Sequence, residues 1–115
     1  MQQVVTHVKL AVTTGEPAGI GPEVSLAAAL EFLRDHTDVQ ITLLGNSQLL
    51  DLPKNLSLEI SSRLNIQSIA LGSPVISGSL NSDNAQYVVS LLDQAIEGCL
   101  QGRFDAMVTA PLSKS

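Results

Sequence analysis

Aromatic residues, cationic residues and cysteines are all scarce in this sequence. Tryptophan is absent, and aromatic residues make up 3% of the 115 positions. Six Lys and Arg residues stand against eleven Asp and Glu, which gives a formal net charge of -5. The cationic residues are scattered singly, with no basic face and no aromatic set for stacking bases. This pattern argues against binding to nucleic acids or to an anionic membrane.

Cysteine and long hydrophobic runs are equally limited. Cys99 has no second cysteine for an internal disulfide. Its register with Val88, Leu92 and Ala95 places it on the apolar side of a helix and predicts a reduced, buried structural thiol. No apolar run approaches the about 18 residues that span a bilayer, and no signal peptide is recognisable. We therefore expect a cytoplasmic protein without a membrane segment.

The remaining composition is typical of a globular domain, with 44% hydrophobic and 15% charged residues. The length is near that of one domain, so we expect a single core and no domain boundary inside residues 1–115. Val8–Thr13 and Val39–Leu44 are short, nearly continuous apolar runs, as expected of strands covered on both faces. Between them, Pro22 and Glu23 suit the first turn of a helix that continues to Asp35. Its apolar residues recur at helical spacing: Val24, Ala27, Ala28 and Phe32.

The middle of the chain predicts a helical turn over Ser47–Asp51, brief strands over Leu56–Ile60 and Ile66–Leu71, and a loop over Gly72–Asn84. A long amphipathic helix then ends at about Gly102, and a strand follows over residues 104–109. The helix stripe is Val88, Leu91, Leu92, Ala95, Ile96, Cys99 and Leu100. Alternating strands and helices of this kind predict an α/β fold with a mainly parallel sheet between helical layers, a three-layer α/β/α architecture.

A glycine-rich loop joins the first strand to the first helix. Its glycines, Gly15, Gly19 and Gly21, follow the pattern G-x-x-x-G-x-G, which differs from both the dinucleotide and the Walker patterns. Unhindered backbone N–H groups that run into a helix N-terminus favour a phosphate or a carboxylate. A tight turn between strand and helix requires the same residues, so both interpretations stay open.

Four polar side chains near the predicted strand ends are ambiguous in the same way. Glu16 and Glu23 can orient a substrate or pair with a cation, while Glu23 alone can compensate the helix dipole. Lys114 can hold a phosphate or act on a proton, or it can be a solvated lysine near the end of the chain. Thr109 can contact a substrate or simply cap a strand. The two histidines stand in unrelated settings and make no metal site together.

Thr14–Glu23 resembles the opening signature of the 4-hydroxythreonine-4-phosphate dehydrogenase family, which acts in pyridoxal phosphate biosynthesis. The resemblance extends from Lys9 onward and is weakest over residues 38–71. Further motifs follow in the family's order and spacing: Pro74-Val75, Gly78, Asn84, Tyr87-Val88-Val89, Gly98-Cys99-Leu100, Gly102, Phe104-Asp105-Ala106, Val108-Thr109-Ala110-Pro111 and Lys114.

This resemblance implies the two-domain architecture of isocitrate and isopropylmalate dehydrogenases, with a cleft between the domains and a homodimer whose active sites use both subunits. It also implies oxidation of 4-phosphooxy-L-threonine by NAD or NADP with a divalent metal. Loss of carbon dioxide then gives 3-amino-2-oxopropyl phosphate. In this role the metal is a Lewis acid for the developing alkoxide and enolate.

Members of the family are much longer than 115 residues. Their Gly-His-Thr-Glu motif, three histidine metal ligands and later substrate contacts follow the Thr-Ala-Pro-x-x-Lys segment. The resemblance therefore implies an N-terminal fragment of the fold that carries no catalytic residue or metal ligand and is inactive alone. Candidates for the substrate or cofactor cleft are Gly15, Glu16, Gly19, Gly21, Thr109 and Lys114.

Two alternatives remain open. A paralogous dehydrogenase that acts on a phosphorylated sugar acid, 4-phospho-threonate or 4-phospho-erythronate, shares the same motifs. A non-catalytic binding or dimerisation module could keep the fold and an anion site at Gly15–Gly21. The last strand, which lacks a following helix to cover it, argues against the module.

Overall fold

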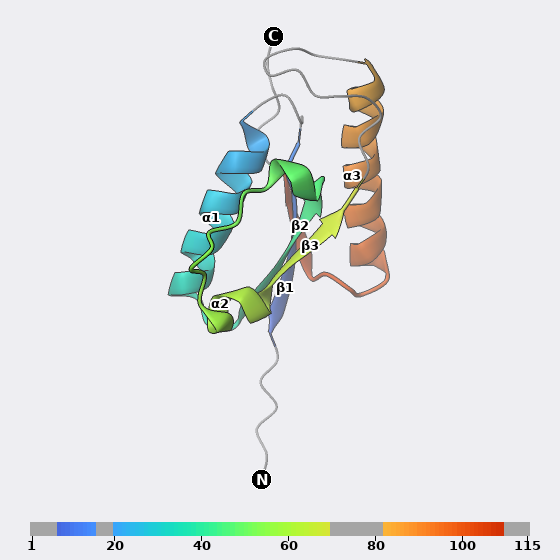
Figure 1. The fold of residues 1–115 in the computed structure, drawn as a ribbon. Coiled ribbons are helices and arrows are strands. Elements are labelled where there is room, and N and C mark those ends of the chain that lie inside the picture. The colour runs from blue at the N-terminus through green and yellow to red at the C-terminus, as the bar shows by residue number, and fades with distance from the viewer. Residues whose placement is uncertain (1–6, 16–19, 70–81, 110–115) are drawn as a thin grey trace.

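The computed structural model describes residues 7–15, 20–69 and 82–109. Figure 1 shows a parallel sheet with helices on both of its faces. The elements, in chain order, are β1 (Val8–Thr13), α1 (Gly21–Asp35), β2 (Val39–Gly45), the 3-10 helix η1 (Ser47–Leu49), α2 (Leu58–Arg63), β3 (Leu64–Ser68), α3 (Ser82–Leu100) and β4 (Ala106–Thr109).

The strand order in the sheet is β3-β2-β1-β4, and every pairing is parallel. The chain steps from β1 through β2 to β3 in one direction and then returns across the sheet to β4. Right-handed crossovers place α1 and α2 on one face and α3 on the other. Figure 1 shows α1 and α3 on opposite sides of the strands. The predicted three-layer α/β fold with a parallel sheet is thus confirmed.

Each face of the sheet has its own hydrophobic core. On the α1 side, Leu33 and Leu43 are fully buried, and residues from α2 and β3 complete the cluster. On the α3 side, Leu91 and Ala95 pack against Ala11 and Leu44. The strands are therefore apolar on both faces, which accounts for the continuous apolar runs in the sequence.

The strand predicted over Leu56–Ile60 is wrong, because this segment leads into α2. The Ser57 hydroxyl accepts a hydrogen bond from the Ile60 N–H at 3.2 Å and caps the helix start. Leu58 is 88% exposed while Ile60 is buried, so the alternation of apolar residues does not mark one face of a strand. The next predicted strand is confirmed but begins earlier, at Leu64, and Leu71 lies outside the described residues.

In α1, the buried face differs from the stripe that helical spacing indicates. Val24 and Phe32 are 42% and 40% exposed. The sheet is covered instead by a neighbouring face that includes Leu26, Leu30 and Leu33. Leucine side chains present more apolar area than the alanines of the predicted stripe, so burying the leucine face gains more hydrophobic free energy. The exposed stripe of α1 remains apolar and lies beside the sheet.

The end of α3 follows the prediction closely. Gly102 has φ +81, and the N–H of Arg103 donates to the Gly98 carbonyl at 2.8 Å, so the chain leaves the helix through a left-handed glycine. Cys99 is a half-buried free thiol packed against the α3-side core. Its predicted location on the apolar side of the helix is confirmed, although its burial is only partial.

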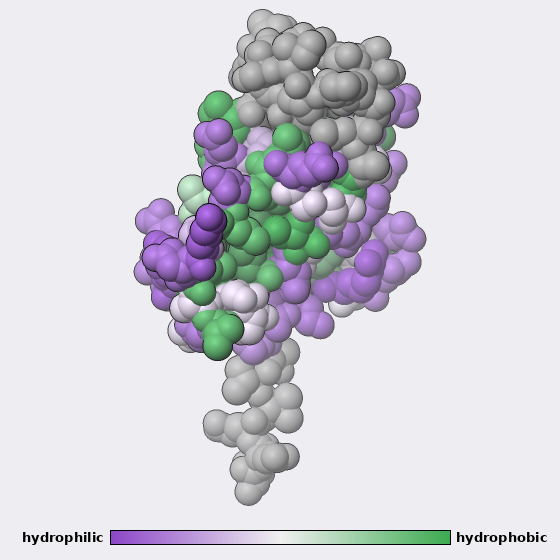
Figure 2. Space-filling view, viewed as in Figure 1, coloured by the Kyte–Doolittle hydropathy of each residue, from purple (hydrophilic) through white to green (hydrophobic). Residues whose placement is uncertain are grey.

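The face shown in Figure 2 has hydrophobic side chains gathered in its middle and hydrophilic residues on both flanks. None of the helices in the described ranges has the length and apolar character needed to cross a membrane.

Candidate functional site

The carboxyl ends of the parallel strands meet at one edge of the sheet, and two of the predicted cleft residues lie there. Thr13, the last residue of β1, pairs in register with Thr109, the last residue of β4. Gly15 therefore follows the end of one strand, and Thr109 ends its neighbour. Gly15 has φ 77, a left-handed conformation that favours glycine. Both residues line one small cavity of about 80 Å³, closed on its far side by Val88, Leu91 and Leu92 of α3.

Gly21, a third predicted residue, is the first residue of α1 and is buried. The N-cap residue is Ile20, which makes no side-chain cap, and Pro22 follows in the first turn. Glu23 lies in the same turn, where a carboxylate interacts favourably with the helix dipole. Glu16, Gly19 and Lys114 lie outside the described residues. The structure therefore brings Gly15 and Thr109 together and places Gly21 at the start of α1.

Next to Gly15 along the chain, Thr14 begins a polar network that joins the ends of β1 and β2 to α3. The Thr14 hydroxyl donates to the Leu44 carbonyl at 3.2 Å and is fully buried. The Asn46 backbone N–H donates to the phenol oxygen of Tyr87 at 2.6 Å. The Thr14 side chain is also close enough to the phenol to affect its pKa. Tyr87 thus connects α3 to this network and holds the helix against two strand ends.

Asn46 extends this network to the third strand. Its side-chain amide donates to the Ile69 carbonyl at 3.0 Å, and its side-chain oxygen accepts from the Gln48 N–H at 3.0 Å. Burial raises the pKa of the Tyr87 phenol above its ordinary value of 10.0, and the nearby Thr14 side chain and the hydrogen bond from the Asn46 N–H oppose that shift by a smaller amount. The phenol is therefore neutral at physiological pH and acts as a hydrogen-bonding group.

Thr14, Asn46 and Tyr87 were not among the sequence-based site candidates. A signal for Tyr87 exists, because it precedes Leu91 and Ala95 at intervals of four on the apolar face of α3, where a phenol needs a polar partner. Nothing in the sequence indicates that this partner is the backbone of Asn46, which is 41 residues away.

Gly45 explains how Thr14 reaches its position. A Cβ atom added to Gly45 would overlap the hydroxyl of Thr14. Because only glycine leaves this space, Thr14 can approach the end of β2 and bond to Leu44. Thr14, the residue before Gly15, is therefore held by a close contact between the ends of β1 and β2.

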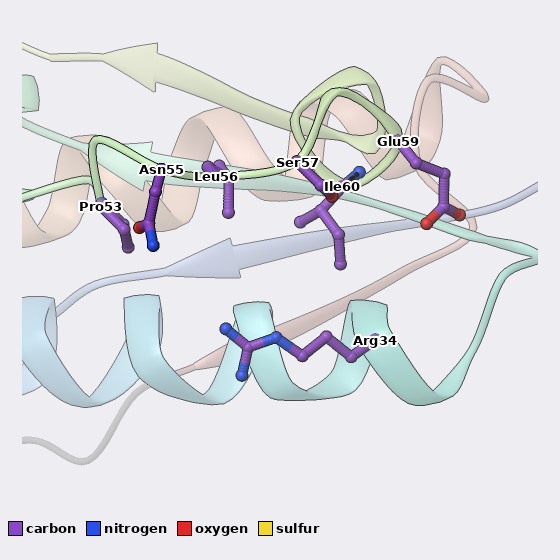
Figure 3. A pocket seen from close by; sticks show the side chains of 7 residues that line it. All are labelled: Arg34, Pro53, Asn55, Leu56, Ser57, Glu59 and Ile60. Atoms are coloured by element: carbon purple, nitrogen blue, oxygen red, sulfur yellow. Dashed lines mark hydrogen bonds between the residues drawn. The ribbon is translucent and has the colours of Figure 1, made fainter.

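A larger hollow of about 380 Å³ lies away from this edge, between the last turns of α1 and the segment that leads into α2 (Figure 3). Arg34 lies along α1, and the side chains of Leu56 and Ile60 point toward that helix. None of the predicted cleft residues lines the hollow. In the described ranges, no group of three or more His, Cys, Asp or Glu side chains could hold a metal ion. We therefore assign no metal ligand to these residues.

Residues 16–115 match the family described as "Pyridoxal phosphate biosynthetic protein PdxA". The 4-hydroxythreonine-4-phosphate dehydrogenase of Burkholderia vietnamiensis is 42% identical over 112 residues, which cover 93% of this chain and 34% of the relative. The enzyme of the same name from Ralstonia nicotianae is 41% identical over 121 residues, covering 92% and 36%. The chain therefore spans about a third of the length of these curated relatives.

The fold is similar to that of solved structures with the same name. The crystal structure of 4-hydroxythreonine-4-phosphate dehydrogenase from Klebsiella pneumoniae matches with a TM-score of 0.71 and 26% identity, covering 93% of this chain and 38% of that one. The resemblance carried by the Thr14–Glu23 signature and the later motifs is thus confirmed. Since the family match extends over most of the sequence, this chain belongs to the PdxA family of pyridoxal phosphate biosynthetic proteins.

Proposed function

We propose that this chain is the N-terminal part of a two-domain 4-hydroxythreonine-4-phosphate dehydrogenase. In this proposal the whole enzyme oxidises the hydroxyl of 4-phosphooxy-L-threonine with NAD or NADP, and the product loses carbon dioxide to give 3-amino-2-oxopropyl phosphate. The observation that carries the proposal is the family match over residues 16–115, joined by relatives that bear this enzyme name. We further propose a cytoplasmic homodimer.

The part of the enzyme seen here would supply one wall of the active-site cleft. Gly15, Gly21 and Thr109 are at the carboxyl edge of a parallel sheet, which is where open α/β sheets bind their ligands. The backbone N–H groups of the Gly15–Gly21 loop suit a phosphate or a carboxylate, and the Thr109 hydroxyl can donate to or accept from a bound substrate. Glu16, Gly19 and Lys114 belong to the same proposed wall. The role of these residues is to bind and orient the substrate or the cofactor.

The divalent metal of the proposed reaction would have its ligands outside the described residues. When bound, it would supply Lewis-acid polarisation of the substrate oxygens. We assign no catalytic residue to this chain and expect the 115 residues alone to be inactive.

The test is an assay of the protein at the length that its own cell produces. The purified protein is given NAD or NADP with 4-phosphooxy-L-threonine, 4-phospho-threonate or 4-phospho-erythronate, with and without a chelator, and reduced cofactor and carbon dioxide are followed. Turnover of the phosphothreonine substrate supports the proposal. Preference for a sugar acid identifies the paralogous dehydrogenase, and turnover of none of the three favours a binding module. Measurable turnover by residues 1–115 alone would contradict our expectation that this chain carries no catalytic residue.

Thr109→Val tests the proposed wall in the same protein. Valine keeps the shape of threonine and removes the hydroxyl, so loss of one hydrogen bond to a charged ligand should lower kcat/KM about 10-fold to 100-fold. Thr42→Val, in the middle of β2, is the matched control and should leave kcat/KM unchanged. Equal kcat/KM values for the two variants would remove Thr109 from the site.

A further inference from the structure

An apolar groove of about 360 Å³ runs between α1 and the edge of the sheet formed by β1 and β4. Its floor includes Leu10, Val12 and Val108, and one wall is the exposed apolar stripe of α1. Val24, Phe32 and Val108 are 42%, 40% and 50% exposed. Single exposed apolar residues are common on protein surfaces, but these three lie together along one groove. A contiguous apolar patch of this kind marks a surface against which other polypeptide packs.

Two features of the groove indicate an unfinished protein interior rather than a small-molecule site. Its lining is almost wholly apolar and lacks the few convergent polar groups that orient a ligand. The polar side chain that α1 contributes is Ser25, whose hydroxyl is buried and has no hydrogen-bond partner among the described residues. Buried hydroxyls in finished interiors are normally paired, so the surroundings of Ser25 are incomplete.

The sheet is also unfinished at this edge. In the described sheet β4 pairs only with β1, and no described strand pairs with its outer side. Exposed, apolar edge strands are usually covered or paired in native proteins. The groove is continuous with this edge, because Val108 and Thr109 of β4 both line it.

We propose that the groove is the docking site for polypeptide from the other two thirds of the relatives' length, and that this polypeptide packs an apolar segment against Val24, Ala28 and Phe32. The occupant follows from the lengths, because the curated relatives are about three times as long as the matched region. A second copy of the chain and a small apolar molecule are the competing occupants. This inference does not depend on the proposed enzymatic activity.

The first experiment measures alkylation rates in the protein at its native length, in a Cys99→Ser background. Ala28→Cys places a thiol in the groove, and Ala27→Cys, the matched control, places one on the opposite flank of α1 outside it. Both alanines are exposed in the structure, so an open groove gives equal rates. We expect Ala28→Cys to react about 100-fold or more slowly than Ala27→Cys, with the same ratio at every protein concentration. Equal rates, or protection that grows with concentration, would overturn the proposal.

The second experiment identifies what covers the groove. A benzophenone amino acid replaces Val24, which lines the groove and is 42% exposed, and the cross-linked peptides are mapped by mass spectrometry. A cross-link to polypeptide beyond residue 115 of the same molecule supports the proposal. Cross-links confined to residues 1–115, cross-links to a second molecule, or no cross-link at all would each overturn it. This result is independent of whether the enzyme assay succeeds.

Discussion

The phenol oxygen of Tyr87 accepts a hydrogen bond from the backbone N–H of Asn46 at 2.6 Å. This contact joins the first turns of α3 to the end of β2, and Tyr87 is 3% exposed. It lies on the far side of the sheet from α1, near the end of β1. The geometry near Gly15 therefore depends in part on a side chain that is not among the predicted cleft residues.

Tyr87→Phe should destabilise the fold. Phenylalanine keeps the ring but leaves the Asn46 N–H without its acceptor, and an unpaired, largely buried donor costs about 1–3 kcal/mol. Urea unfolding followed by circular dichroism measures the change. Ser62→Ala is the control, because it removes a hydrogen bond of an exposed hydroxyl and should change the free energy of unfolding by less than about 0.5 kcal/mol. Equal effects of the two changes would show that the Tyr87 contact is not a buried one.

Tyr87 should also make stability depend on alkaline pH. Burial raises its pKa in the fold above the ordinary value of 10.0, so the unfolded chain releases the proton first as pH rises. The stabilisation is complete below about pH 10 and is lost as pH rises through the pKa of the folded state. The difference in unfolding free energy between the unsubstituted protein and Tyr87→Phe should shrink over this range. Tyrosinate absorbance, taken as a difference between the two proteins, gives the midpoint, and a midpoint at or below 10 would contradict the prediction.

Gly45→Ala should destabilise the protein through its contact with Thr14. The added Cβ would overlap the Thr14 hydroxyl, and such overpacking costs about 1–3 kcal/mol. In the double variant with Thr14→Ala, the nearest remaining Thr14 atom is Cβ, at 3.2 Å from the added carbon. The double variant should therefore be more stable than the sum of the single changes by about 1 kcal/mol. Simple additivity in urea unfolding would mean that the two residues do not touch.

Gly98 and Gly102 should respond differently to substitution, although both lie at the end of α3. A Cβ on Gly98 would overlap the Phe104 ring, whereas a Cβ on Gly102 meets no atom within 4 Å. Gly102 needs glycine for its φ of +81 instead. Gly102→Ala should lower the free energy of unfolding by about 1–2 kcal/mol, and Gly102→Asn should lower it less, because asparagine tolerates that conformation. At Gly98, asparagine should be no better tolerated than alanine. Thermal unfolding of the four variants checks this order.

Much of the fold could be predicted because its signals are local. The apolar run at Val39–Leu44 reflects a strand covered on both faces, and Gly102 ends α3 through its own backbone conformation. The start of α2 was missed because one capping hydroxyl, that of Ser57, outweighs the apolar alternation around it. The buried face of α1 was missed because periodicity gives a helix more than one apolar stripe, and only packing selects between them.

The site was predicted less completely, for a related reason. Gly15 and Thr109 could be inferred, since strand ends of a parallel sheet gather at one edge. The contact between Tyr87 and Asn46 depends on how α3 is placed over the sheet, which no short segment encodes. Arg63 is a similar case. In the sequence it is one of six scattered cations, and in the structure its guanidinium is buried.

Arg63 provides the last prediction. Its guanidinium donates to the carbonyls of Leu33, His36 and Val39 at 2.8, 2.8 and 3.0 Å, and so satisfies the end of α1 and the start of β2. Arg63→Met would leave these carbonyls without donors and should cost about 3–5 kcal/mol. Arg63→Lys keeps the charge but not the planar fork, so its cost should be intermediate.

The ion pair of Arg63 with Glu59 is the natural control. Glu59 accepts from the guanidinium at 2.8 Å, but its side chain is 63% exposed, and surface pairs contribute only about 0–1 kcal/mol. Glu59→Gln should therefore change the unfolding free energy far less than Arg63→Met. If the two variants were equally destabilised, Arg63 would act through its carboxylate partner, and its bonds to the three backbone carbonyls would contribute little to the fold.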